Sequence, residues 1–181
     1  MADEPIITEY QDFKIIFSND EWKTLQFSIF WVFNAVAKAD GRIDKKELDA
    51  LSHLMNNSSA IINELARDII TTIEKDFTKI KEELDNDKRE IIDGLRNVSD
   101  LLNTKVNQAT AVNFKKTLIA IGFYIANASG KWLGSKVSSE ENIAIKLAGM
   151  NLRLSAAQLE EVPTINEIFS SFDERFLMNS E

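Results

Sequence analysis

Proline is missing from the 157 residues that lie between Pro5 and Pro163. At an ordinary proline content of about 5%, a run of this length would hold about eight prolines. Because proline breaks helix interiors and marks loops, its absence favours helices joined by short turns. A chain of 181 residues also suits one hydrophobic core. We therefore predict a single compact all-α domain over residues 1–181.

Helix starts are marked by the capping-box pattern, in which a small polar residue and a Glu or Gln three positions later satisfy each other's backbone N–H groups. The pattern occurs at Ser18–Glu21, Asp44–Glu47, Ser138–Glu141 and Ser155–Gln158. With the hydrophobic periodicity it predicts about seven to nine helices, at 19–38, 45–56, 59–76, 78–104 with a break at 85–87, 108–128, 139–152, 156–161 and 164–176. The last helix has five apolar residues at helical spacing, which suits either a lid on the core or a detachable partner helix.

Composition excludes several classes of site. The chain has no cysteine and one histidine, His53, so disulfides, thiolate zinc sites, cysteine nucleophiles and sites with two imidazoles are ruled out. A net charge of −8 opposes a main role in binding nucleic acid. The excess of acid lies in residues 1–21 and 160–181, whereas residues 105–153 hold seven basic and two acidic residues. The second half is therefore basic enough to attract an acidic partner.

Nothing in the sequence indicates export or a membrane span. The first residues lack the basic and apolar regions of a signal peptide, which predicts a cytoplasmic protein. The apolar stretches 25–37 and 117–128 are shorter than the roughly 20 residues that cross a bilayer. We expect both stretches to be buried core helices.

The chain contains an internal repeat with an offset of 89 residues. This offset aligns an apolar helix with another, so that Leu25 falls on Phe114 and Val36 on Ile125, each followed by a small-residue turn. The predicted organisation is pseudo-repeat 1 at about 19–56, connecting helices at 59–104, pseudo-repeat 2 at about 108–152 and C-terminal helices at 156–176. Neither copy can bury its apolar helix alone, so we expect one shared core.

At the two turns the sequence resembles the TerB-like family, the tellurite-resistance protein TerB and its relatives. The first copy, Ala37 to Glu47, reads A-K-A-D-G-R-I-D-K-K-E and matches the family pattern well. The second copy, Ala126–Gly130 and then Val137–Glu141, has Ser129 in place of the aspartate and a longer loop. The resemblance implies an all-helical fold of two pseudo-repeats, a divalent metal at the acidic turns and a role in bacterial stress, tellurite or phage resistance.

Ordinary helix-turn-helix construction explains most of the first turn. Gly41 suits the left-handed conformation that ends a helix, and Asp44 with Glu47 suits a capping box. Asp40 is the exception, because a carboxylate at a helix C-terminus is disfavoured by about 0.3–1 kcal/mol. Either Lys38 or Arg42 compensates for it, or a bound cation does. Oxygen ligands would select Ca²⁺, Mg²⁺ or Mn²⁺, and the candidate ligands are Asp40, Asp44, Glu47, Glu140 and Glu141.

The loop between the second turn and its capped helix is the second candidate site. It carries Trp132 and Leu133 between Lys131 and Lys136. A loop tryptophan often anchors a partner, although it equally often folds back to fill space. These four residues are the predicted contacts for an acidic protein partner or an anionic membrane surface.

The sequence therefore predicts a cytoplasmic, non-enzymatic interaction module of the TerB-like stress-response type, with a protein partner and an optional divalent cation. Two alternatives stay open. One is a metal-dependent enzyme that uses the same acidic cluster for phosphoryl chemistry, although no base or phosphate clamp is recognisable. The other is a structural scaffold that docks partners through its C-terminal helix.

Overall fold

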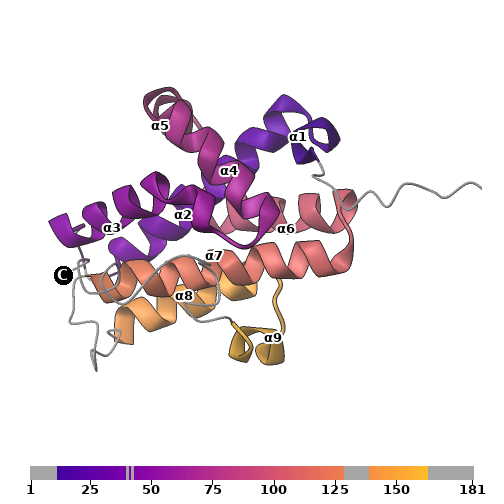
Figure 1. The fold of residues 1–181 in the computed structure, drawn as a ribbon. Helices are drawn as coiled ribbons and strands as arrows, with labels where there is room; N and C mark the ends of the chain where they lie inside the picture. The colour runs from indigo at the N-terminus through magenta and orange to yellow at the C-terminus, as the bar shows by residue number, and fades with distance from the viewer. Residues whose placement is uncertain (1–11, 40, 42, 129–138, 163–181) are drawn as a thin grey trace, which may run out of the picture.

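The fold is all-α, as the sequence predicts (Figure 1). The computed structural model describes residues 12–39, 41, 43–128 and 139–162, and this part of the chain contains helices and no strand. The elements are α1 (Phe13–Ile16), α2 (Asn19–Ala37), α3 (Lys45–Asn56), a 3-10 turn η1 (Ser58–Ala60), α4 (Glu64–Lys75), α5 (Phe77–Asp85), α6 (Ile91–Lys105), α7 (Gln108–Ala128), α8 (Ser139–Asn151) and α9 (Ala156–Glu160).

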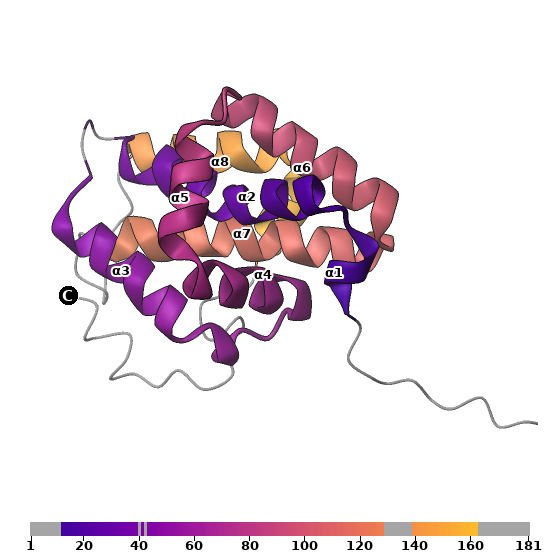
Figure 2. The same ribbon diagram turned by 90° about the horizontal axis from the view of Figure 1, so that it is seen from above.

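Two long helices, α2 and α7, form the centre of the molecule. Every residue of α2 from Thr24 to Phe33 is buried, and so is every residue of α7 from Thr117 to Gly122. A helix that is buried all round needs neighbours on every side. Figure 2 shows α3 and α4 on one side of α7 and α8 on the other, and α6 packs along α2. Both apolar stretches are therefore core helices, as expected.

Local capping chemistry explains most helix boundaries. Ser18 with Glu21, Asp44 with Glu47 and Ser155 with Gln158 each form the complete capping box predicted for them. The predicted break after residue 85 is present, because the connection between α5 and α6 spans residues 86–90. Predicted helices 108–128 and 139–152 agree with α7 and α8 to within one residue. The predicted box at Ser138 and the helix 164–176 lie outside the described residues.

The helix prediction is wrong in two places. The prediction of one helix over 59–76 fails because η1 ends at Ala60 and a new helix begins at Glu64, where the Asn63 side chain accepts a hydrogen bond from the N–H of Ala66 at 2.9 Å. The four-residue helix α1 was not predicted; it is capped by Asp12 and buries Phe13. Single-residue caps of this kind are weaker sequence signals than the two-residue box.

Helices α2 and α6 approach each other closely at a glycine. A Cβ at Gly94 would overlap the ring of Trp31, so the missing side chain lets the indole lie directly on the α6 backbone. Trp31 also makes an edge contact with Phe27, at 5.8 Å between ring centroids. Within the described helices, none combines the length and the apolar content that crossing a bilayer requires.

The positions aligned by the predicted repeat are buried in both helices. Leu25 and Phe114 are fully buried, and so are Val36 and Ile125. Any two helices at the centre of a core would share this property, so the pseudo-repeat itself stays a prediction. Because α2 packs against α7, both halves of the chain contribute to one core.

Candidate functional site

The first turn is built as a helix-turn-helix connection. Gly41 has a φ of +106°, a conformation that favours glycine, and its N–H donates to the carbonyl of Lys38. The Asp44 side chain accepts from the N–H of Glu47 at 2.8 Å, and Glu47 Oε1 accepts from the N–H of Asp44 at 3.0 Å. Each of these carboxylates therefore has one oxygen committed to capping α3. Asp40, the residue that motivated the cation hypothesis, lies outside the described residues.

The other predicted metal ligands differ in exposure. Glu47 and Glu141 are both buried, at 0% and 4% exposed, whereas Glu140 is on the surface. No three acidic or histidine side chains lie close enough to hold an ion within the ranges that the structure describes. Asp44, Glu47, Glu140 and Glu141 are therefore not gathered into such a group among the described residues. The metal site stays a prediction, as do the contacts of Lys131, Trp132, Leu133 and Lys136, which lie outside the described residues.

An apolar pocket opens between α7, α8 and α9, in a place that was not predicted. Its volume is about 590 Å³. Apolar side chains make most of its lining, and the charged groups in it are Lys146 and Glu160. The main apolar contributions come from Ile119 and Phe123 of α7, Ile145 and Met150 of α8, and Leu154 and Leu159. This volume and lining are typical of sites that bind apolar groups.

The pocket exists because the chain reverses after α8. Arg153 has a φ of +62°; its N–H bonds to the carbonyl of Met150, and the N–H of Leu154 bonds to that of Gly149. These two bonds form a Schellman motif, which ends the helix and redirects the chain. Ser155 then caps α9, so that α9 returns beside α8. A Cβ at Gly149 would overlap Leu159, so α9 packs closely against α8 at this glycine.

A stripe of exposed apolar side chains follows α8 from the pocket. Ile143, Leu147 and Met150 are 66%, 46% and 64% exposed, and they lie at helical spacing on one face. Met150 also lines the pocket, so the two features are continuous. We call Ile143, Leu147 and Met150 the outer stripe of α8. Single exposed apolar residues are common, but a stripe that continues into an apolar pocket is typical of a binding surface.

Of three basic residues in this part of the chain, two are paired with acidic groups. Lys116 Nζ lies 3.1 Å from a carboxylate oxygen of Glu161, which ties the chain after α9 to α7. Arg153 pairs with Asp100 of α6. Lys146 is exposed at the pocket. The surface therefore combines apolar contact area with one exposed ammonium, Lys146, and one carboxylate, Glu160.

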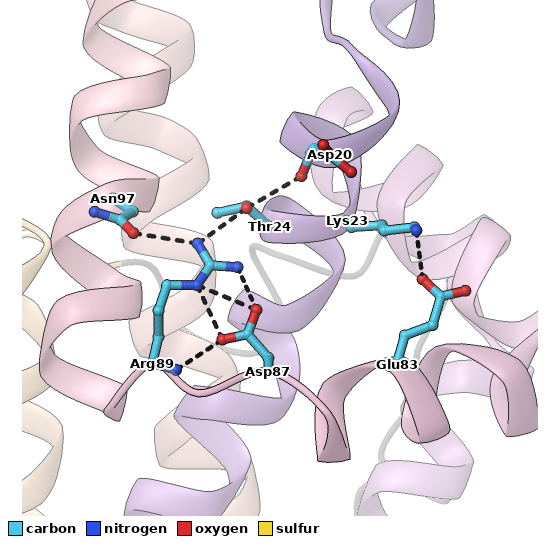
Figure 3. A network of polar contacts seen from close by, with 7 residues as sticks. All are labelled: Asp20, Lys23, Thr24, Glu83, Asp87, Arg89 and Asn97. Atoms are coloured by element: carbon cyan, nitrogen blue, oxygen red, sulfur yellow. Dashed lines mark hydrogen bonds and ion pairs between the residues drawn. The ribbon is translucent and has the colours of Figure 1, made fainter.

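A network around Arg89 fastens the α5–α6 connection to the core (Figure 3). The guanidinium donates to both carboxylate oxygens of Asp87, to Thr24 of α2 at 3.1 Å and to Asn97 of α6 at 3.2 Å. It also lies 5.0 Å from the ring centroid of Trp31, a cation–π distance. The hydrogen bonds that Asp87 accepts from the Arg89 side chain hold the pKa of the Asp87 carboxyl below its usual value. The Arg89 network is structural, because its donors are directed at the protein's own groups.

Lys115 is a buried lysine between α6 and α7. Its side chain is almost completely inaccessible, and Nζ donates to Ser99 Oγ at 3.0 Å and to Asn103 Oδ1 at 3.2 Å. Burial lowers the pKa of the Lys115 ammonium, the positive charge of Arg153 lowers it further, and Asp100 opposes the change. Neutral acceptors compensate a buried charge only in part.

We expect Lys115→Met to raise the free energy of unfolding near neutral pH by about 1–2 kcal/mol, because a buried charge is replaced by an apolar chain of similar length. Between the lowered pKa of Lys115 in the folded protein and its ordinary pKa of 10.5, the folded protein holds fewer protons at this lysine than the unfolded chain does. The wild type should therefore gain stability relative to the variant as pH rises through that window. Urea unfolding of both proteins across the window measures this difference. A difference independent of pH, or an equal effect of Lys88→Met at an exposed site, would contradict it.

Comparison with known proteins identifies a relative. No protein-family model matches the chain, and no solved structure matches it. The uncharacterized protein ORF11' of Methanothermobacter thermautotrophicus is 32% identical over 148 residues, which span 78% of this chain and 93% of that protein. The chain belongs to the ORF11' family. Because the match covers nearly all of ORF11', the family relationship extends over the helical domain and does not depend on a single motif.

Sequence reasoning missed the pocket of this ORF11' family member for a physical reason. Apolar residues occur around the whole circumference of α8, so its sequence does not indicate which face is buried. The available signals were Gly149 within a helix and the capped segment after Arg153, which together indicate a close helix contact and then a reversal of the chain.

Proposed function

We propose that this protein is a cytoplasmic, non-enzymatic interaction module of a stress response, of the type that the TerB-like resemblance implies. The observation that supports the proposal is the apolar pocket together with the outer stripe of α8. Burying one large aliphatic side chain contributes about 1.5–3 kcal/mol, so the stripe and the pocket offer enough energy for a specific complex. The proposed binding surface consists of Ile143, Leu147 and Met150 with the pocket behind them.

The proposed partner is an acidic amphipathic helix. An apolar stripe on a helix beside an apolar pocket suits a second helix that inserts side chains at i, i+3, i+4 and i+7 spacing. Lys146, which is exposed at the pocket, favours an acidic group on the polar face of that helix. Both properties come from the same part of the chain, which supports one recognition surface.

Affinity capture with matched variants tests the proposal. Leu147→Glu places a charge on the outer stripe, and we expect it to weaken capture of the partner at least tenfold, a loss of about 1.4 kcal/mol or more. Ile15→Glu is the control, because Ile15 is an equally apolar residue that is 81% exposed on α1. The captured protein is then purified and titrated against all three chains. Equal binding to wild type, Leu147→Glu and Ile15→Glu would show that the outer stripe is not the binding surface.

A further inference from the structure

We propose that residues 163–181 of the chain dock on the outer stripe of α8 and on the apolar pocket. This surface is the one named in the proposed function, but the docking requires no partner. The docking itself stands on separate observations: the start of the segment, its apolar pattern, its charge and the shape of the surface.

The segment begins beside the pocket. Leu159 lines the pocket, and Val162 packs against the core at the end of the described chain. Between these two residues, Glu161 forms an ion pair with Lys116, which holds the end of the described chain against α7. Ile165 follows Val162 by three residues, which span at most about 10 Å. The first apolar residue of the segment is therefore within reach of the pocket without any rearrangement of α9.

The sequence of the segment is that of a short amphipathic helix. Thr164 and Glu167 have capping-box spacing, and the apolar positions share one face: Ile165, Ile168, Phe169, Phe172 and Phe176. A helix of about 12 residues is marginal in water on its own and needs an apolar surface to pack on. At 1.5 Å per residue it is about 18 Å long, close to the length of the 13-residue α8.

Charge complements shape. Residues 163–181 carry four acidic residues and one arginine, and the charged groups at the pocket are Lys146 and Glu160. Lys146 lies at the pocket, where it can face an acidic side chain of the docked helix. The segment therefore offers an apolar face for the pocket and the outer stripe, and acidic side chains that can pair with Lys146.

A second apolar pocket is a weaker candidate for the same segment. It has a volume of about 270 Å³ and is lined by residues that include Leu48, Met55 and Phe77. Its volume is less than half that of the α8 pocket. It also lies on α3, and Figure 2 shows α3 and α8 on opposite sides of α7. The start of the segment beside Leu159 favours the α8 side.

Disulfide trapping in the full-length chain tests the inference directly, because the protein has no cysteine of its own. Leu147→Cys is combined with Phe169→Cys on the apolar face of the segment, or with Ser170→Cys on its polar face as the matched control. We expect the Phe169→Cys pair to form an intramolecular disulfide at least about tenfold faster than the Ser170→Cys pair, because docking raises the effective concentration of one face only. Non-reducing electrophoresis and thiol counting of dilute protein measure the rates.

Three results would overturn the proposal. Equal rates for the two faces would mean that the segment collides with α8 without docking. Preferential trapping of Phe169→Cys with Leu48→Cys would place the segment at the second pocket. Disulfides that form only between chains, detected by mixing the single-cysteine variants, would assign the surface to a second copy. The two proposals can fail independently. Loss of partner capture in Leu147→Glu does not require the segment to touch α8, and disulfide trapping of the segment does not require a partner.

Discussion

Leu25→Ala and Phe114→Ala should each lower the free energy of unfolding of the whole chain by about 2–5 kcal/mol, the range for removing a large buried side chain. Both residues are fully buried, one in α2 and the other in α7. Because these helices pack against each other at the centre of the fold, a cavity beside either one weakens contacts that belong to both halves. The sites also occupy aligned positions in the predicted repeat.

The measurement is chemical unfolding monitored by tryptophan fluorescence and by far-ultraviolet circular dichroism. Trp22 and Trp31 both lie in α2, and Trp132 is the third tryptophan of the chain, so in a Trp132→Phe background fluorescence reports the first half, whereas circular dichroism reports every helix. We expect coincident transitions for both variants, because one shared core unfolds in one step. Leu48→Ala is the control, since Leu48 is half exposed and should change stability by about 0.5 kcal/mol or less. Separate transitions in Phe114→Ala would show that the halves fold independently.

Arg89→Met should lower the free energy of unfolding by about 2–3 kcal/mol, because it removes charge-assisted hydrogen bonds that other side chains were positioned to accept. The substitution leaves Asp87 without its guanidinium, and it removes the cation from the face of Trp31. That indole cannot move toward α6, because Gly94 already lies against it. Arg89→Lys keeps the charge and loses the planar fork, so we expect it to recover less than half of the loss.

The sign of the pH dependence is determined by Asp87. Its hydrogen bonds with Arg89 lower its folded pKa below 3.8, so the stability that the pair contributes is present above pH 3.8 and is lost as pH falls through the folded pKa. The difference between wild type and Arg89→Met should therefore be largest near neutral pH and smaller at about pH 3. Lys88→Met, an exposed neighbour, is the control and should have little effect at either pH. A difference that grows on acidification would contradict the assignment.

Sequence alone predicted the features that depend on residues close together in the chain. Three capping boxes, the break after Asp85, the core helices and the positive φ at Gly41 each depend on a few neighbouring residues. The separation of η1 from α4 was missed because Asn63 caps without a partner at the third helical position. Local chemistry thus determines most element boundaries in this protein.

Features that depend on residues far apart in the chain were not predictable. The sequence places Lys115 in a basic region, but its burial depends on how α6 meets α7. The reach of Arg89 to Thr24 crosses 65 positions of sequence, and the pocket needs α7, α8 and α9 together. Because apolar residues lie around the whole circumference of α8, its sequence does not show which face packs against the neighbouring helices. The candidate surface was therefore visible only in three dimensions.

Gly149 lies where α8 and α9 meet, next to the pocket. Because this residue has only hydrogen in place of a side chain, Leu159, which forms part of the pocket wall, packs directly against it. A methyl group there would overlap the end of the Leu159 side chain, which would have to turn away. Gly149→Ala would therefore change the shape of the pocket at one wall, while the wall that α7 contributes keeps its side chains.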